Sequence, residues 1–135
     1  MMENKPKIES FKDLEAWKAG HKLVILIYKL TKLFPKDEIF GIVNQMRKAA
    51  VSITSNIAEG FSRQSPKEKS QFYSIAKGSI TEIQNQILIS KDVGYMKDIE
   101  YNEAENQSVK VSKLITGLLK YTRGLSILLI LITLY

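Results

Sequence analysis

Apolar residues recur at spacings of three and four along most of this 135-residue chain, and no stretch alternates convincingly at a spacing of two. The clearest series has successive spacings of 4, 3, 4, 3 and 4 and consists of Ile39, Val43, Met46, Ala50, Ile53 and Ile57. Such spacing places every member on one face of a helix, where it can pack against another helix. The sequence therefore predicts an all-α fold.

Prolines and glycines divide the periodic segments into four expected helices. Their approximate bounds are 10–33, 37–59, 65–93 and 98–123. Pro35 ends the first, because the residue before a proline avoids the helical conformation. Gly60, Gly94 and Gly124 are expected to end the other three, with Gly60 in the left-handed conformation that suits a helix end. Long helices with short connections predict an antiparallel up-down-up-down four-helix bundle.

Two of the expected helices begin with capping residues. Ser10 precedes the first helix, with Asp13 three positions later in the arrangement of a capping box. Ser65 precedes the third, with Pro66 at its first position and Glu68 three positions after the serine. These signals predict where both helices start.

The last eleven residues, LSILLILITLY, are almost wholly apolar. We divide the chain into a bundle over residues 1–124 and an apolar C-terminal tail over residues 125–135. Eleven residues are too few to cross a bilayer as a helix, and an exposed apolar patch is a liability for a monomer. We expect the tail to be buried within the bundle or in a neighbouring subunit, with membrane contact as the alternative.

The segment RKAAVSITSNIAEGFSR, residues 47–63, combines helical periodicity with many small side chains. Small residues allow two helix backbones to approach closely, and serine or asparagine can form hydrogen bonds across the contact. Two interpretations stay open at this point. The segment lines a tight crossing within the chain, or it forms an interface between subunits.

The net charge is +6, from 20 lysines and arginines against 14 acidic residues. Five cations flank the small-residue segment or follow it: Arg47, Lys48, Arg63, Lys67 and Lys69. We interpret them as a candidate basic surface for nucleic acid, whose phosphates such a surface attracts. With only three arginines in the chain, weak backbone contact is a better expectation than sequence-specific readout. The alternative is that the lysines only solvate helix faces.

No catalytic or metal-binding pattern stands out. The chain has no cysteine, and its single histidine, His21, cannot supply the paired ligands of a di-iron bundle. We expect no enzyme activity, no cofactor and no metal, and we interpret His21 as a surface or boundary residue. The polar start, MMENKPKIES, is not a secretory signal. A cytoplasmic location is the prediction.

Three segments together resemble the family of proteins encoded by intervening sequences in bacterial 23S ribosomal RNA genes. They are FKDLEAWKAG, IYKLTKLFPKDEIFGIVNQMRKAAVSITSNIAEGFSR and FYSIAKGSITEIQNQILISKDVGY. The chain is also similar to the accessory protein of diversity-generating retroelements, which works beside a reverse transcriptase, and that similarity implies contact with nucleic acid. The matching motif residues are Gln45, Arg47, Ser52, Asn56, Glu59, Gly60 and Arg63.

The resemblance implies a left-handed antiparallel four-helix bundle that assembles as a homopentamer, and it supplies no catalytic residue. The expected partners are further copies of the chain and RNA or DNA, with no membrane partner. The alternative function is that of a scaffold or accessory subunit that binds another protein without contacting nucleic acid.

Overall fold

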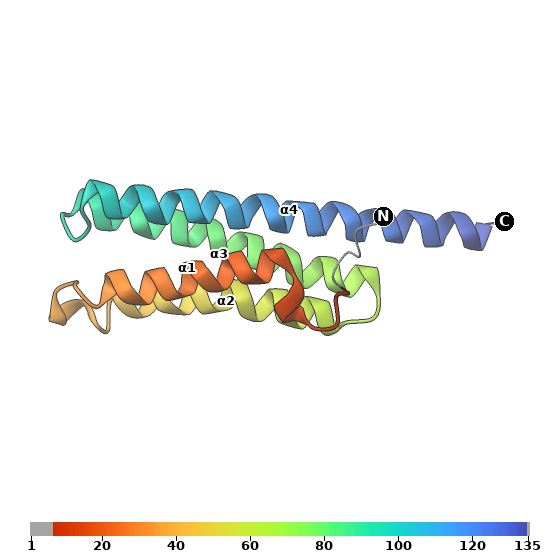
Figure 1. Cartoon of the computed structure of the whole chain (residues 1–135), viewed down its shortest axis with the longest axis horizontal. Coiled ribbons are helices and arrows are strands. Elements are labelled where there is room, and N and C mark those ends of the chain that lie inside the picture. Colours follow the sequence, from red (N-terminus) through yellow and green to blue (C-terminus); the bar gives the residue numbers. More distant parts are fainter. Residues whose placement is uncertain (1–6, 135) are drawn as a thin grey trace, which may run out of the picture.

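The computed structural model describes residues 7–134 and consists of four long helices (Figure 1). They are α1 (Glu15–Thr31), α2 (Ile42–Ser62), α3 (Pro66–Asp92) and α4 (Asp98–Leu134). Two short 3-10 turns, η1 (Phe11–Asp13) and η2 (Lys36–Glu38), precede α1 and α2. The predicted all-α four-helix bundle is confirmed.

Each helix packs against two neighbours, in the cyclic order α1, α2, α3, α4 and back to α1. The α1–α2 and α3–α4 connections lie at one end of the bundle, and the α2–α3 connection lies toward the other (Figure 1). Neighbouring helices therefore run antiparallel, as expected from their short connections. The C-terminal part of α4 extends well past the α2–α3 connection (Figure 1).

The core forms where the apolar faces of all four helices meet. Twelve apolar residues in it have no exposed surface: Leu23, Ile27, Met46, Ala50, Ile53, Ile57, Ala76, Ile83, Ile87, Ala104, Val111 and Ile115. Five members of the predicted series in α2 are buried, which confirms that face. The prediction for Ile39 is wrong, because α2 begins only at Ile42 and Ile39 is 51% exposed just after η2.

At least one polar contact joins each pair of neighbouring helices. Arg47 of α2 donates to the Thr31 hydroxyl of α1 at 3.0 Å, and the Ser52 and Ser79 hydroxyls of α2 and α3 lie 2.9 Å apart. The Gln84 amide of α3 donates to the Ser108 hydroxyl of α4 at 3.1 Å. The fourth contact runs from the Gln107 amide of α4 to the Ala19 carbonyl of α1, at 2.9 Å. Apolar faces tolerate sliding, whereas these directional bonds are satisfied in one register of the bundle.

The predicted N-terminal caps are confirmed. The Ser10 side chain and Asp13 form a capping box, although the box caps η1 and not α1 itself. The Ser65 hydroxyl accepts the backbone N–H of Glu68 at 3.1 Å at the start of α3. Both serines therefore satisfy backbone donors that a helix start leaves without intrahelical partners.

Of the three glycines expected to end helices, only Gly94 does so, with a φ of 86°. Gly60 lies inside α2, which continues to Ser62, and no positive φ is found for it. Gly124 lies inside α4, which continues to Leu134. The predicted ends at Gly60 and Gly124 are wrong, because a glycine permits a helix end without imposing one.

The apolar tail is a direct helical continuation of α4. Its described side chains beyond Ser126 are exposed, so the expected burial within the bundle is wrong. By length and composition, α4 is the one helix among residues 7–134 that could cross a membrane. The structure does not describe residues 1–6 or Tyr135. Residues 1–6 make up most of the polar start that we interpret as lacking a secretory signal.

Candidate nucleic-acid interface

Arg47 occupies the seam between α1 and α2. Its Nε donates to the hydroxyl of Thr31 at 3.0 Å, and its guanidinium carbon lies 4.8 Å from the centre of the Tyr28 ring. The Thr31 hydroxyl in turn donates to the carbonyl of Ile27 at 2.7 Å. Thr31 is buried and Tyr28 is 39% exposed. The inner part of the arginine is therefore fixed against α1, while its position at the seam leaves it half-buried.

Two shallow hollows meet at Arg47. One is lined in part by Tyr28, Asn44, Lys48 and Ser55, and the other in part by Thr31, Lys32, Pro35 and Lys36. We call this surface the Arg47 face and define it by Tyr28, Lys32, Lys36, Asn44, Arg47, Lys48 and Ser55. It offers four cations, one exposed ring and two small polar side chains, which is a combination suited to phosphate and sugar groups.

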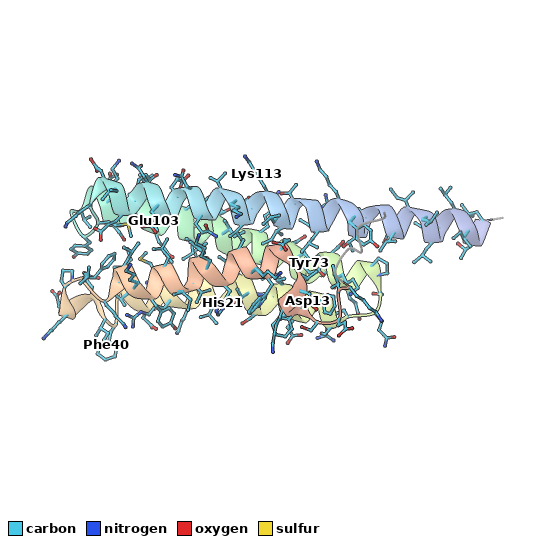
Figure 2. The ribbon with its side chains drawn as sticks, viewed as in Figure 1. Asp13, His21, Phe40, Tyr73, Glu103 and Lys113 are labelled. Atoms are coloured by element: carbon cyan, nitrogen blue, oxygen red, sulfur yellow. The ribbon has the colours of Figure 1, made fainter. Side chains whose placement is uncertain are left out.

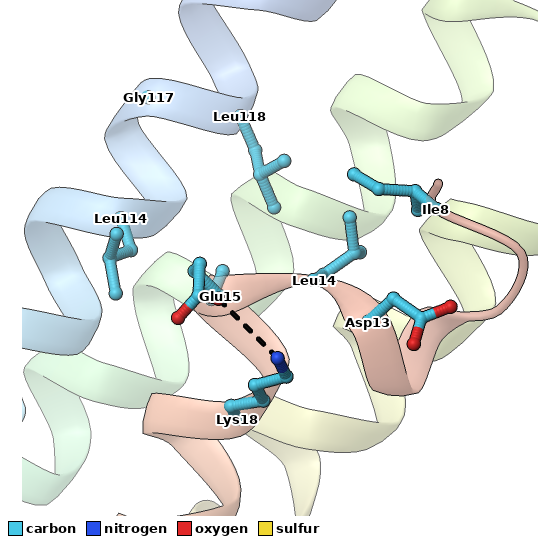
Figure 3. Close-up of a pocket in the computed structure, with 9 residues that line it drawn as sticks. Ile8, Asp13, Leu14, Glu15, Lys18, Leu114, Gly117 and Leu118 are labelled. Atoms are coloured by element: carbon cyan, nitrogen blue, oxygen red, sulfur yellow. Dashed lines mark hydrogen bonds and ion pairs between the residues drawn. The ribbon is translucent and has the colours of Figure 1, made fainter. Parts of the chain in front are cut away.

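Acidic side chains are scarce on α1 and α2. Each of these helices contains one, Glu15 and Glu59 respectively. Glu15 pairs with Lys18 at 3.4 Å (Figure 3), and Glu59 pairs with Arg63 at 3.1 Å. Within residues 7–134, no carboxylate lies within ion-pair distance of a cation of the Arg47 face. Asp37 and Glu38 follow Lys36 directly in the sequence, but neither forms an ion pair with a cation of the Arg47 face.

The other three predicted cations lie at the α2–α3 connection. Arg63 is 16 positions after Arg47, which corresponds to about 24 Å along a helix. Its guanidinium binds Glu59 and lies 4.8 Å from the centre of the Phe72 ring. Lys67 is exposed beside it in the sequence. The five predicted residues therefore form two separate groups.

Lys69 has a structural contact in this region. Its ammonium donates to the backbone carbonyls of Gly60 and Phe61 at 3.3 and 2.8 Å. These carbonyls belong to the last turn of α2, where intrahelical partners are missing. Burial lowers the pKa of Lys69 below its usual value. Lys69 thus caps the last turn of α2, with N–H donors directed to backbone carbonyls.

The family motif residues divide into packing and exposed positions. Ser52 bonds to Ser79, and the Asn56 amide donates to the Ser52 carbonyl at 2.7 Å and to its hydroxyl at 3.0 Å. Gly60 is buried, whereas Gln45 and Glu59 are exposed. The inner part of the small-residue segment therefore lines a crossing between α2 and α3. A subunit interface stays a prediction for its exposed side chains.

Sequence reasoning missed Tyr28, Lys32 and Lys36 as members of the site. Tyr28 is an aromatic residue of α1, yet it is 39% exposed. A signal was present in the scarcity of acidic residues between Glu15 and Ser62, where only Glu15, Asp37, Glu38 and Glu59 occur. Which of the many lysines lie beside Arg47 depends on the pairing of α1 with α2.

A different hollow lies between the start of α1 and the middle of α4 (Figure 3). Its walls are largely apolar, with Ile8, Leu14 and Leu118 around it. The Asp13 carboxylate at its edge accepts the backbone N–H groups of Glu9 and Ser10 at 2.9 and 3.0 Å. These bonds lower the pKa of Asp13 below its usual value. The carboxylate is engaged in capping, so the hollow presents no activated acid or base.

His21 lies on the exposed side of α1, as predicted (Figure 2). Its ring stacks on Trp17 with 4.8 Å between centroids and an angle of 16° between planes. Across residues 7–134, no three histidine or acidic side chains come together as metal ligands. The absence of metal and of enzyme activity stays a prediction for the whole chain.

The fold and the Arg47 face define an antiparallel four-helix bundle with a basic seam between its first two helices. Residues 12–117 match the family model described as 23S rRNA-intervening sequence protein. The match spans well over half of the chain, which therefore belongs to that family.

A solved structure shares the fold. It is the 1.70 Å crystal structure of a protein of unknown function from the S23 ribosomal protein family of Bacteroides thetaiotaomicron VPI-5482. The two proteins are 21% identical, with a TM-score of 0.73 over 78% of this chain and 95% of the other. At that identity the likeness shows a common fold and nothing about function. No curated protein matches the chain.

Proposed function

We propose that this protein binds RNA or DNA through the Arg47 face, without sequence-specific readout and without catalysing a reaction. The carrying observation is the cluster of Lys32, Lys36, Arg47 and Lys48 around two joined hollows that contain no paired carboxylate. Phosphate groups are the ligands that such a cluster recognises by charge alone. The expected cytoplasmic location is part of the same proposal.

The geometry of Arg47 supports this function. An arginine that is already held by Thr31 and Tyr28 loses little side-chain freedom on binding, which lowers the entropic cost of contact. The exposed part of the Tyr28 ring is a surface on which an unpaired base or a sugar can pack. Single-stranded or looped regions are therefore the preferred ligands within the proposal.

Assembly into a homopentamer, as the family resemblance implies, belongs to the proposal too. Five copies would carry a net charge of about +30 and would present five Arg47 faces. Several weak phosphate contacts on one ligand give a much stronger total attachment than a single contact. The expected affinity is therefore higher for long nucleic acids than for short ones.

A scaffold function is the second candidate, favoured by the end of the bundle where α1 joins α2. Phe40 is 92% exposed there and projects away from the bundle (Figure 2). Leu33 and Ile99 are each 76% exposed. A hydrogen bond of 3.2 Å from the Tyr95 hydroxyl to Glu38 ties the two connections at this end together. Exposed apolar side chains on a rigid end are suited to a protein partner.

The test is a comparison of two double variants with equal loss of charge. Arg47→Gln with Lys48→Gln alters the Arg47 face, and Arg63→Gln with Lys67→Gln alters the α2–α3 connection. Fluorescence anisotropy of labelled structured RNA and duplex DNA is measured at several salt concentrations. The first variant is expected to reduce the slope of log affinity against log salt by roughly two, and the second to leave it nearly unchanged.

Native mass and helical circular dichroism verify that both variants are assembled and folded. Arg47→Lys serves as a further control, since it retains the charge and loses the planar donor geometry. Equal effects of the two double variants would assign binding to overall charge and contradict a role for the Arg47 face. The scaffold function would be favoured by two results together. Neither the wild type nor the variants would bind the RNA or DNA, and the wild type would capture a protein partner that Phe40→Glu no longer captures.

A further inference from the structure

The C-terminal part of α4 leaves the bundle as an isolated apolar rod. Ser126 still lies beside the first turns of α3, in a groove that Lys67 also lines. Every apolar residue from Ile127 to Leu134 is between 49% and 72% exposed. The segment from Leu125 to Leu134 rises about 15 Å, which is about half the thickness of the hydrocarbon core of a bilayer. Figure 1 shows this rod projecting past the other three helices.

The rod is apolar around its whole circumference. Between Leu125 and Leu134, its only polar side chains are Ser126 and Thr133. The Thr133 hydroxyl donates to the backbone carbonyls of Leu129 and Ile130 at 3.1 and 2.9 Å, so its polar group is satisfied within the helix. A helix that docks on a protein needs one apolar stripe and keeps its other faces polar. An all-round apolar helix whose threonine hydroxyl is bonded within the helix fits lipid instead.

Four cations lie on the α3–α4 side of the bundle toward the base of the rod, and we call them the basic collar: Lys67, Lys77, Lys120 and Arg123. Arg123 lies between two grooves, of which one is lined by Lys67 and the other by Lys77 and Lys120. No acidic residue occurs in the chain after Glu105, and none of the four collar cations pairs with a carboxylate within residues 7–134. Tyr121, 68% exposed, lies at the same level of α4.

Basic and aromatic side chains next to an apolar helical segment match the layers of a membrane surface. Lysine and arginine are attracted to anionic headgroups, and tyrosine is enriched at the boundary between headgroups and hydrocarbon. We infer that residues 125–134 insert into the hydrocarbon of an anionic membrane, with the basic collar at the headgroups. The bundle is then held at the membrane surface by the end that contains the α2–α3 connection. The sequence alone predicts that the protein has no membrane partner. This expectation changes because α4 continues through the apolar tail as one helix to Leu134.

The test measures flotation of the full chain with vesicles. Vesicles of phosphatidylcholine mixed with phosphatidylglycerol are compared with vesicles of phosphatidylcholine alone. The wild type is expected to float with both and to prefer the anionic vesicles. Leu128→Glu with Ile132→Glu places two carboxylates in the rod and is expected to reduce partitioning by roughly a hundredfold or more. Lys120→Gln with Arg123→Gln is expected to reduce the preference for anionic vesicles.

Phe40→Glu is the matched control, because it makes the same kind of change at the most exposed apolar residue of the opposite end. It is expected to leave flotation unchanged. The depth of insertion can be read from a polarity-sensitive fluorophore, since the chain has no cysteine of its own. A label on Ile130→Cys is expected to shift to the blue with vesicles and to resist a water-soluble quencher, and a label on Phe40→Cys is not.

Two results would overturn the inference. The wild type could stay in the soluble fraction with both kinds of vesicle. The double glutamate variant could float as well as the wild type, which would place membrane contact elsewhere. If the wild type does not float, a lower native mass of the glutamate variant without lipid would show that the rod pairs with a second copy of the chain.

Discussion

The Tyr73 ring of α3 lies directly against the backbone of Gly60 in α2. A Cβ atom at position 60 would be 2.6 Å from Cε1 and 2.8 Å from Cδ1 of that ring. Tyr73 is only 3% exposed, so the ring has little room to move. We predict that Gly60→Ala lowers the free energy of unfolding by roughly 1–3 kcal/mol, measured by urea denaturation.

Gly78→Ala is the control for that prediction. Gly78 lies on the exposed side of α3, and a Cβ there meets no atom within 4 Å. Alanine favours a helix over glycine by up to about 1 kcal/mol, so this change should stabilise the protein slightly. Equal destabilisation by both substitutions would show that the Gly60–Tyr73 contact is not tight.

The hydrogen bond between Ser52 and Ser79 joins α2 to α3 at 2.9 Å. Ser79 is 8% exposed, so Ser52→Ala leaves a buried hydroxyl without its partner, whereas in Ser79→Ala the Ser52 hydroxyl keeps only its bond from the Asn56 amide. A double-mutant cycle of Ser52→Ala and Ser79→Ala should therefore give a coupling energy of about 0.5–1.5 kcal/mol. Strict additivity of the two single effects would show that the bond contributes nothing to stability.

Stability at alkaline pH depends on Tyr73. Burial raises its pKa above the usual value, so the folded protein keeps a phenolic proton that the unfolded chain releases above about pH 10. The free energy of unfolding should therefore fall as pH rises beyond that value. Tyr73→Phe should show a smaller fall, measured by urea denaturation at neutral and alkaline pH.

Two other groups with shifted pKa values, Tyr95 and Lys69, are present in both proteins. Burial and the hydrogen bond to Glu38 raise the pKa of Tyr95, and burial lowers that of Lys69. The difference between wild type and Tyr73→Phe therefore isolates Tyr73. Identical pH profiles would show that Tyr73 ionises as easily in the folded protein as in the unfolded chain.

Thr31→Val tests whether the position of Arg47 matters in addition to its charge. Valine has the shape of threonine but cannot accept the Arg47 Nε–H. We predict weaker nucleic-acid binding with an unchanged salt slope, because the cation remains but is held less firmly. Anisotropy titrations measure both quantities. Binding equal to that of the wild type would show that the Thr31 contact does not prepare the site.

The helical period predicted most of the core, because apolar residues three and four positions apart lie on the same face of a helix and are buried together. It failed at Ile39, where Gly41 precedes the first residue of α2 and a 3-10 turn replaces the expected first turn. The glycine signals failed at Gly60 and Gly124, for two different reasons. Gly60 makes room for Tyr73 from another helix, and the apolar residues after Gly124 continue α4.

The candidate site could be predicted only in part. Arg47 and Lys48 are neighbours in sequence, and their place beside the small-residue segment was visible. Lys32 and Lys36 join them only because α1 packs against α2 and brings Thr31 to Arg47. The distance of Arg63 from Arg47 and the capping role of Lys69 also depend on where α2 ends. The sequence predicted that end at Gly60, and α2 continues to Ser62.

The most direct test of the central claim is the binding of wild-type protein to labelled structured RNA and duplex DNA over a range of salt concentrations. Fluorescence anisotropy gives the affinity, and native mass is measured in the same buffer. If the Arg47 face contacts phosphates, the protein should bind at least one of the two ligands. The logarithm of its association constant should then fall linearly with the logarithm of the salt concentration. No binding to either ligand at low salt, with the protein folded, would contradict it.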